Sequence, residues 1–354
     1  MRRSPRLSPH LDPTLRLKQI PLDDSRWHEF VRSRSDATPF HHPVWASLLA
    51  ECYGLSGFVL TQSGESGTIT AGIPVLEPPR LPRRPRRLVS LPFTDALPPL
   101  VDPDAARTFT VAADAFRRDA GAARIELRGT LEGARPADVQ AVTHLLALTG
   151  DPAEVARGFS KDKLRNTRVA ERKGLTVRRA ESERDLTEAF FDLHVATRRR
   201  LGVPTQPKRF FRLLWTRLIE PGHGFVLVVE HGTTPVGGGV FLAGNGVVVY
   251  KFSATDAAWQ AQKPNDLMLW TAIRDSCLEG FSSFDFGRSD LAGAGLRAYK
   301  SSWGAVEEPL VYSTIGEGEA GESPGETGIL GSVLRRSPIW VTRATGELLY
   351  RYAA

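Results

Sequence analysis

A pair of apolar segments occurs twice along the chain, and this repeat constrains the fold more than any other feature. Phe58–Leu60 (FVL) is followed by Ala71–Leu76 (AGIPVL), and in the second half Phe225–Leu227 (FVL) is followed by Gly237–Leu242 (GGGVFL). Short apolar runs separated by stretches rich in Gly, Ser, Thr or His are typical of β-hairpins. A repeated hairpin predicts two copies of one folding unit. The alternative is chance similarity, because short apolar strands resemble one another easily.

The sequence around each hairpin predicts a mixture of helices and strands. Each hairpin follows a helical stretch with a tryptophan, at residues 45–53 and 210–219. Further strands are expected at 88–91, 124–127, 175–180, 247–252, 283–286 and 310–313, and further helices at 108–120, 136–148, 183–201 and 264–279. This pattern predicts an α+β fold of two tandem domains, each a mixed, mostly antiparallel sheet covered by helices.

Length and composition agree with two domains. The chain has 354 residues, and its 41% hydrophobic and 24% charged residues are typical of a folded protein. We expect a disordered basic leader over 1–19, domains over 20–155 and 156–315, a flexible Gly- and Glu-rich linker over 316–328, and a helical tail over 329–354. The apolar stripe of that tail would dock on the body, or else on a partner or a membrane surface.

Charge, cysteine and histidine content exclude several classes of protein. The formal net charge of +6 is far below that of a chromatin or ribosomal tail, so DNA is not an expected partner. Cys52 and Cys277 are too few for a disulfide framework and lack metal-ligand spacing. The pair His41-His42 before Pro43 indicates a helix N-terminus, and no metal site is expected. Because no segment reads as a signal peptide or a membrane span, we expect a cytoplasmic protein.

One expected helix carries a row of cations. Residues 160–174 read SKDKLRNTRVAERKG, and four basic side chains fall on one helical face. They are Lys161, Arg165, Arg168 and Arg172. Only Asp162 and Glu171 dilute this charge, whereas a solvated face usually mixes both signs. The pattern predicts a face that binds phosphate groups or tRNA, and the alternative is an ordinary solvated helix.

A second group of polar and aromatic motifs lies between residues 250 and 300. In chain order the motifs are Tyr250-Lys251, Pro264-Asn265, Phe284-Asp285-Phe286-Gly287-Arg288 and Tyr299-Lys300. Asp285 stands at the end of an expected strand, where functional groups collect, and Gly287 permits a tight turn. The alternative is that Asp285 caps a loop or pairs with Arg288.

In order and spacing these motifs resemble the FemAB-like branch of the GNAT acyltransferase superfamily. The resemblance covers roughly residues 20–315 and includes Phe40-His41-His42-Pro43-Val44-Trp45 and Ser90-Leu91-Pro92-Phe93-Thr94-Asp95. Such proteins have two tandem GNAT-like domains, and founding members transfer an amino acid from aminoacyl-tRNA to an amine of a peptidoglycan precursor. The chain departs from the GNAT pattern where the pyrophosphate loop (Q/R)xxGx(G/A) should stand, because Ala258–Lys263 reads AWQAQK.

The resemblance also implies roles for particular residues. Lys300 lies in a segment similar to the family's Phe-Lys motif, which handles substrate phosphate or the reacting carbonyl, so a catalytic role is expected for it. From its place at a strand end, Asp285 is the candidate for orienting or deprotonating the amine. The substrate-binding residues implied are Tyr250, Lys251, Asn265, Arg288, Asp95 and Trp45.

The expected activity is therefore N-acyl or aminoacyl transfer. It would form an amide between an activated donor, in the first place aminoacyl-tRNA, and the amine of a peptide, sugar or cell-envelope precursor. The donor would be a co-substrate, so no resident cofactor is expected, and contact with a membrane-linked precursor would be peripheral. Two alternatives stay open: an acyl-CoA-dependent GNAT N-acetyltransferase, and a non-catalytic RNA- or phosphate-binding protein that uses residues 161–173.

Overall fold

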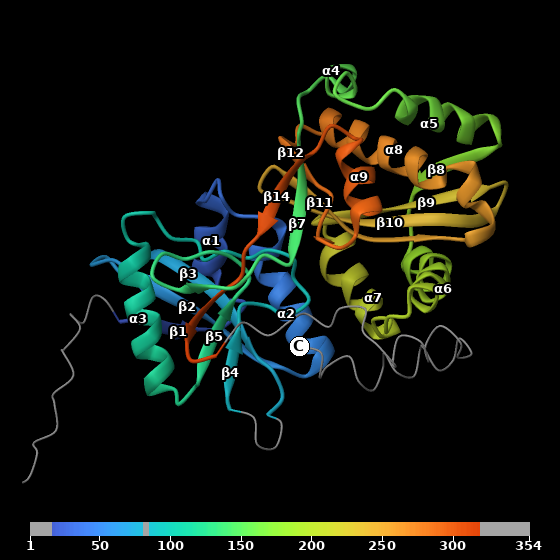
Figure 1. The fold of residues 1–354 in the computed structure, drawn as a ribbon. Helices are drawn as coiled ribbons and strands as arrows, with labels where there is room; N and C mark the ends of the chain where they lie inside the picture. The colour runs from blue at the N-terminus through green and yellow to red at the C-terminus, as the bar shows by residue number, and fades with distance from the viewer. Residues whose placement is uncertain (1–15, 81–84, 319–354) are drawn as a thin grey trace, which may run out of the picture.

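The computed structural model describes residues 16–80 and 85–318. These residues form two sheets that lie side by side and are covered by helices (Figure 1). This is the expected α+β fold of two mixed, mostly antiparallel sheets. The expected tail, most of the expected linker and most of the expected leader lie outside the described residues. Lys18 and Gln19, which end the expected leader, pair with the first sheet.

The first sheet, with its helices, makes the first unit. Within the described residues its strand order is β1-β2-β3-β4-β5-β15-β6. The strands are β1 (Lys18–Ile20), β2 (Ser56–Ser63), β3 (Ile69–Glu77), β4 (Arg87–Val89), β5 (Arg124–Leu127), β15 (Ser313–Gly316) and β6 (Arg135–Pro136). The helices are α1 (Ser25–Ser33), a short 3-10 turn (Pro39–His41), α2 (Pro43–Tyr53) and α3 (Ala106–Asp119).

The second sheet, with its helices, makes the second unit. Its order within the described residues is β13-β7-β12-β11-β10-β9-β8, and β14 also pairs with β7. The strands are β13 (Ser289–Asp290), β7 (Ala141–Ala147), β12 (Ser283–Asp285), β11 (Val247–Thr255), β10 (Thr234–Gly244), β9 (Gly224–His231), β8 (Leu175–Arg179) and β14 (Val306–Leu310).

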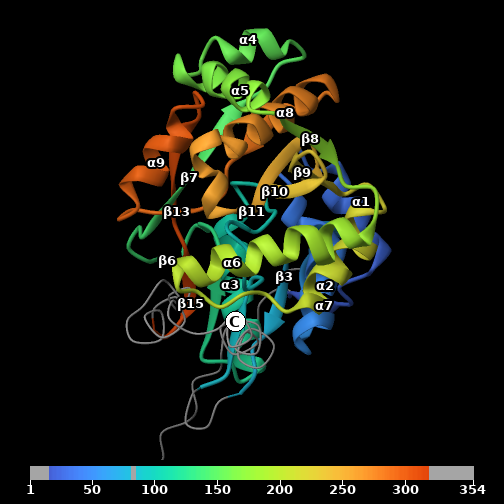
Figure 2. The same ribbon diagram turned by 90° about the vertical axis from the view of Figure 1, so that its right-hand side faces the viewer.

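Helices cover both faces of the second sheet. Helices α5 and α8 lie on one side of it, and α6 and α7 lie on the other (Figures 1 and 2). The helices are α4 (Pro152–Ala156), α5 (Asp162–Arg172), α6 (Phe191–Leu201), α7 (Lys208–Leu214), α8 (Pro264–Leu278) and α9 (Ala294–Ser301), with helical turns at Asp185–Phe190, Trp215–Ile219 and Ala257–Gln262. No helix of the described residues is long and apolar enough to cross a membrane.

The two expected hairpins are present and share one register. Phe58 faces Val75 across β2 and β3, and Phe225 faces Phe241 at the equivalent position of β9 and β10. Since side chains alternate between the faces of a sheet, an equal register places equivalent side chains toward equivalent helices. The hairpins therefore frame both units in the same way.

The units exchange strands, so the expected boundary at residues 155 and 156 does not coincide with the division between the sheets. Strand β7 precedes that boundary but pairs with β12 and β14 of the second sheet. Strand β15, near the end of the expected second domain, pairs with β5 and β6 of the first sheet. Figure 1 shows both crossings, β7 in green among orange strands and β15 in red beside β5.

The expected helix over 136–148 is wrong, because these residues form part of β6 and all of β7. The segment Ala141–Ala147 reads AVTHLLA, and Ala141, Val142, Thr143 and His144 are all buried. A strand with neighbours on both edges and cover on both faces shows such a continuous apolar run instead of alternation. A run of this kind is compatible with a helix or a strand from the sequence alone.

The ends of two helices follow from their sequences. Helix α8 begins at Pro264 and is followed by Gly280 at φ 83°, a left-handed conformation in which glycine is favoured. Helix α2 begins at Pro43, and the ring of His42 accepts a hydrogen bond from Val44 N. His42 thus caps a helix N-terminus, as its position before Pro43 predicts.

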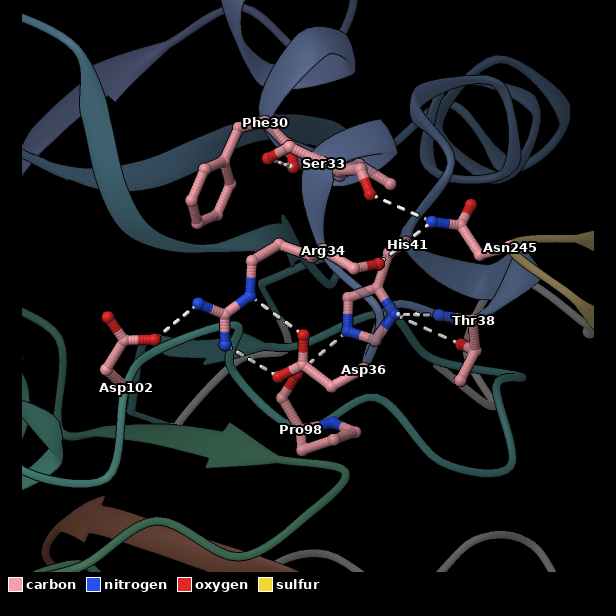
Figure 3. Close-up of polar contacts among 10 residues, drawn as sticks. Phe30, Ser33, Arg34, Asp36, Thr38, His41, Pro98, Asp102 and Asn245 are labelled. Carbon is pink, nitrogen blue, oxygen red and sulfur yellow. Dashed lines mark hydrogen bonds and ion pairs between the residues drawn. The ribbon is translucent and has the colours of Figure 1, made fainter.

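Polar contacts and a shared core join the two units. Asn245, in the turn between β10 and β11, donates hydrogen bonds to the carbonyls of Val31 and Arg34 at the end of α1 (Figure 3). In the same view His41 Nε2 lies 2.9 Å from Pro98 O, so this histidine holds a loop inside the first unit. One hydrophobic cluster contains both Trp45 of α2 and residues of α7, so the units pack as one body.

Candidate active site

Charged side chains from both units meet where the two sheets adjoin. Asp95 follows β4 in the first unit, while Lys251 lies on β11, Asp285 ends β12 and Lys300 lies on α9. Lys251 Nζ is 3.1 Å from Asp95 Oδ1. Asp95 also interacts electrostatically with Lys300 and Asp285. We call Asp95, Lys251, Asp285 and Lys300 the junction cluster.

The loop that carries Asp95 has a strained backbone. Leu91 and Phe93 have φ angles of 56° and 62°, a region that residues other than glycine seldom occupy. Each such residue costs about 1–3 kcal/mol, so surrounding contacts must hold it. One of them is the indole of Trp45, which donates to Thr94 Oγ1 at 2.9 Å. The strain is therefore located where the first unit reaches the second.

Lys251 is enclosed at the junction. Its ammonium donates to Phe93 O at 3.0 Å and lies 5.1 Å from the ring centre of Phe40 and 5.8 Å from that of Trp45. Aromatic faces attract cations, more strongly when water is excluded. Trp45 itself has no exposed surface. It therefore acts on the site by holding Lys251 and the strained loop.

Asp285 lies within a turn made possible by a glycine. Its Oδ1 accepts hydrogen bonds from Thr143 Oγ1 at 2.5 Å and from Gly287 N at 2.7 Å, and burial raises the pKa of this carboxyl. Gly287 has φ 70°, and a Cβ there would stand 3.0 Å from Tyr250 O and 3.4 Å from Asp95 Oδ2. Asp285 thus caps its own turn, and the missing side chain of Gly287 lets Asp95 approach closely.

Lys300 is buried and lies near the end of α9. Its Nζ donates to Gly287 O at 2.6 Å and to Arg288 O at 3.1 Å, and only 5% of the residue is exposed. Burial lowers the pKa of the Lys300 ammonium to about 8, and Asp95 and Asp285 oppose that shift. Lys300 does not pair with Glu307, which instead binds Arg297 at 2.7 Å.

Arg288 lies beside the junction cluster. Its guanidinium donates to Tyr312 OH at 3.1 Å and to Asp290 Oδ1 at 2.7 Å, so it does not pair with Asp285. Tyr312 OH in turn donates to Asp95 O at 2.8 Å. Tyr312 was missed in the sequence because it follows β14 and meets Asp95 only through the return of the chain to the first sheet.

Two other expected substrate-binding residues have internal partners. Tyr250 is buried, its ring stacks on Phe241 with centroids 5.1 Å apart, and burial raises the pKa of its phenol above the ordinary value. Asn265 Oδ1 accepts a hydrogen bond from Thr255 Oγ1 at 2.7 Å at the start of α8. Tyr250 touches the cluster through its backbone, whereas Asn265 belongs to the α8 end of the second unit.

The expected cationic face lies on α5. All four of its basic side chains, Lys161, Arg165, Arg168 and Arg172, are exposed. No hydrogen bond or ion pair joins these four side chains to another described residue. Helix α5 covers α8 on the outside of the second unit (Figure 2), so this face points to solvent away from the first unit.

A buried polar network on the other face of α5 was missed. Lys163 Nζ lies 3.6 Å from Asp266 Oδ1, and Asp266 also accepts hydrogen bonds from Tyr299 OH and Asn166 Nδ2, each at 2.7 Å. The position of Lys163 on the helix could have indicated this network. Lys163 is off the cationic stripe and shares its face with Thr167 and Ala170, the buried side of the helix.

The segment before α8 does not form a glycine-rich phosphate loop. Residues Ala257–Gln262 make a 3-10 turn capped by Asp256, whose side chain accepts from Ala258 N, and Lys263 follows at φ 64°. Aspartate at this place brings negative charge to a turn that in the GNAT pattern receives pyrophosphate.

Comparison with known proteins adds a family match. Residues 157–301 match the family model of the acetyltransferase (GNAT) domain. The sequence matches no curated protein.

Solved structures similar to this chain share its fold along most of the length. The crystal structure of FemX has a TM-score of 0.69 at 14% identity and covers 85% of this chain and 97% of its own. A C-terminal domain of a putative lysylphosphatidylglycerol synthetase from Agrobacterium fabrum gives a TM-score of 0.54 at 13% identity, covering 82% and 90%. A tandem GNAT protein from the clavulanic acid biosynthesis pathway gives 0.50 at 13% identity, covering 87% and 99%.

Proposed function

We propose that this chain is a FemAB-like acyltransferase, because residues 157–301 match the acetyltransferase (GNAT) domain model and the fold is similar to that of FemX. We also propose its donor and its acceptor. The proposed donor is an aminoacyl-tRNA. The proposed acceptor is the amine of a peptide, sugar or cell-envelope precursor, and the product is an amide. An aminoacyl-tRNA donor also fits a cytoplasmic location, which remains a prediction.

The observation that carries the proposal is the buried ammonium of Lys300 beside two carboxylates. An ammonium has three N–H donors, and the carbonyls of Gly287 and Arg288 take two of them. The third is available for an oxygen of the substrate. A donor fixed in a site that excludes water stabilises a developing oxyanion far better than one in water.

The chemical step needs little beyond positioning. The acceptor amine attacks the ester carbonyl of the donor, a C–N bond forms, and the C–O bond to the tRNA ribose breaks. The proton released by the amine ends on the ribose oxygen. Lys300 would stabilise the oxyanion of the tetrahedral intermediate. Asp285, whose raised pKa makes it a better proton acceptor, would first deprotonate an acceptor that arrives as an ammonium.

Two features of the second unit favour tRNA over acyl-CoA as the donor. The 3-10 turn before α8 has no glycine and is capped by Asp256, so it offers no pyrophosphate loop. The exposed cations of α5, namely Lys161, Arg165, Arg168 and Arg172, offer a row of charges to a phosphate backbone. We therefore assign the outer face of α5 to the donor.

The acceptor would bind at the junction between the units. Lys251 and Arg288 supply positive charge there, and Asp95 supplies a carboxylate that can bind the amine. Tyr250, Asn265 and Trp45 would act by holding these groups in place. A structural neighbour named for lysylphosphatidylglycerol synthesis supports an acceptor linked to a membrane, which this chain would meet peripherally.

A second candidate function, acyl-CoA-dependent N-acetylation, is also supported by one observation. The family model that matches is described as an acetyltransferase domain, which favours an acyl-CoA-dependent N-acetyltransferase. A non-catalytic RNA-binding protein would use α5 alone and leave the junction cluster without a role.

Mass spectrometry of the products decides among these functions. The purified protein is given either aminoacyl-tRNA charged with a mixture of amino acids or acetyl-CoA, together with a panel of peptide, amino-sugar and lipid-headgroup amines. The proposal expects aminoacylated amine with tRNA only, and loss of the product in Lys300→Met but not in the distant control Lys18→Met. Acetylated product would favour the second function, and salt-sensitive RNA binding without any product would favour the third.

A further inference from the structure

Helix α9, which carries Lys300, packs one hydrophobic side chain against the core, that of Tyr299. Lys300 is its one buried residue, and Leu296 on the same helix is 50% exposed. Most helices of a globular protein are held by burial of an apolar face. The Lys300 ammonium donates to Gly287 O and Arg288 O, and the contacts of its neighbours on α9 fix the helix from which it reaches them.

Tyr299 makes the buried contact of this kind. Its hydroxyl donates to Asp266 Oδ1 on α8 at 2.7 Å. Burial and the Asp266 carboxylate raise the pKa of the Tyr299 phenol above its ordinary value, so the group remains a donor. Asp266 is itself only 4% exposed. Tyr299, the residue next to Lys300, is thereby fixed to α8, the helix that packs against α5.

Helix α5 completes the same contact from its inner face. Lys163 Nζ lies 3.6 Å from Asp266 Oδ1 and 4.2 Å from the ring centre of Tyr299. Asn166 donates to the other carboxylate oxygen of Asp266. The residues of α5 that hold Asp266 alternate along the helix with Arg165 and Arg168, whose side chains are exposed on its outer face.

A buried ion pair is a poor device for stability, because desolvation of both charges offsets their attraction. Its better attested use is to specify one arrangement where apolar packing would allow several. A further ion pair of α9, between Arg297 and Glu307, is about 30% exposed at both side chains and hence weaker.

We infer that Lys163, Asp266 and Tyr299 form a positioning network that fixes α9 and the Lys300 ammonium, and that this network couples Lys300 to a polyanion bound on the outer face of α5. The coupling rests on the proposed donor, whereas the positioning does not. The positioning and the coupling follow from one arrangement. The outer face of α5 would bind the donor, the inner face of α5 contacts Asp266, and Asp266 binds Tyr299, the residue next to Lys300.

Hydrogen exchange of the substrate-free protein tests the positioning. In Tyr299→Phe, which removes one hydroxyl and keeps the ring, protection of the amides in 294–301 should fall by about tenfold. Asp266→Asn is the second variant and should act on the same amides. The matched control is Thr110→Val, which removes a buried hydroxyl that donates to Glu132 O in the first unit. Equal protection of 294–301 in Tyr299→Phe and the control would overturn the positioning network.

Kinetics separate positioning from a merely structural role. Tyr299→Phe should lower kcat about tenfold to a hundredfold and leave KM for the acceptor unchanged, because a small displacement of a catalytic group has effects of that size. Thr110→Val should leave both constants unchanged. A fall in thermal stability with unchanged kcat would contradict the inference.

Deacylated tRNA tests the coupling. It should raise protection of 294–301 in the wild-type protein and fail to do so in Lys163→Met, while still binding that variant. If tRNA binds and leaves 294–301 unchanged in the wild type, the coupling is wrong. If tRNA does not bind at all, the proposed donor is wrong and the coupling falls with it, but the Tyr299→Phe result still stands or falls by itself.

Discussion

Glu126 in the first unit and Lys300 in the second unit are both buried charges, but their partners differ in kind. In the first unit Glu126 on β5 lies between two guanidiniums, with Arg124 Nε at 2.7 Å and Arg87 Nη1 at 3.1 Å. In the second unit Lys300 has only carbonyl oxygens within hydrogen-bonding distance, and its carboxylates act from farther away. The Glu126 carboxylate is thus neutralised by two guanidiniums in direct contact with it. The Lys300 ammonium has no such partner, and its pKa is lowered to about 8.

This difference separates a structural charge from a chemical one. A buried carboxylate with two partners contributes to a single arrangement of its sheet. A buried ammonium that lacks a carboxylate at contact distance has a lowered pKa and a donor left for substrate. The same hairpin framework thus supports both, and the loop with Leu91 and Phe93 in left-handed conformations brings the first unit to the chemistry of the second.

Removal of the Lys300 charge should have the largest effect on activity. Lys300→Met should lower turnover by about 100- to 1000-fold, the usual effect of losing one oxyanion donor. Thermal stability should change little, because methionine fills similar space and the lowered pKa shows that burial already opposes the charge. Product formation by mass spectrometry and a thermal melt measure the two effects. Lys18→Met, on the exposed β1, is the control, and full activity in Lys300→Met would leave the catalytic group unidentified.

Removing the Glu126 charge should have the reverse effect. Glu126→Gln leaves two guanidiniums without their carboxylate, so the free energy of unfolding should fall by about 1–3 kcal/mol. Turnover at a temperature where the variant is folded should stay within about twofold of wild type, since among the described residues the Glu126 side chain pairs with Arg87 and Arg124 and not with the junction cluster. Urea denaturation and the product assay provide the numbers. A large loss of turnover would show that both charges serve the chemistry.

The repeated hairpin could be predicted from local sequence patterns. Most of the features that were missed depend on pairing between residues far apart in the chain. The short apolar runs FVL and AGIPVL, and again FVL and GGGVFL, are separated by stretches rich in Gly, Ser, Thr or His, and this pattern is enough to predict both hairpins. Strand β7 could not be predicted, because the apolar run AVTHLLA is compatible with either a helix or a strand. Its partner strands β12 and β14 lie far along the chain.

The candidate site was predictable in part for the same reason. Motifs located Asp285 and Lys300 individually, but Lys251 and Asp95 are separated by 156 positions, and only the fold brings them together. Burial of Lys300 was missed because a lysine is expected at the surface and the apolar Leu296 inside, whereas α9 exposes Leu296 and buries Lys300.

Deprotonation of Lys300 should give the pH profile of turnover an alkaline limb. Lys300 must be protonated to stabilise an oxyanion, and its pKa is lowered to about 8. Turnover should therefore fall about tenfold per pH unit above that value. In Lys300→Arg the guanidinium stays protonated, so the limb should disappear while turnover lies between those of wild type and Lys300→Met.

The lowered pKa of Lys300 should also make the free energy of unfolding depend on pH. Because the folded pKa lies below the unfolded one, the native state holds fewer protons than the unfolded state above pH 8 or so. The free energy of unfolding should then rise with pH from about 8 toward the ordinary lysine pKa near 10.5, and this rise should be absent in Lys300→Met. A limb or a stability slope that survives in Lys300→Met would assign the titration to another group.

The smallest expected effect concerns charges that are exposed, the opposite case to Glu126 and Lys300. Arg165→Ala and Arg168→Ala on α5 should weaken binding of deacylated tRNA and reduce the slope of log K against log salt by about one unit per lost contact. Stability should not change, because neither side chain has a partner among the described residues. Filter binding at several salt concentrations measures the slope. Binding that is unchanged in both variants would make the outer face of α5 an ordinary solvated surface and remove the main support for tRNA as the donor.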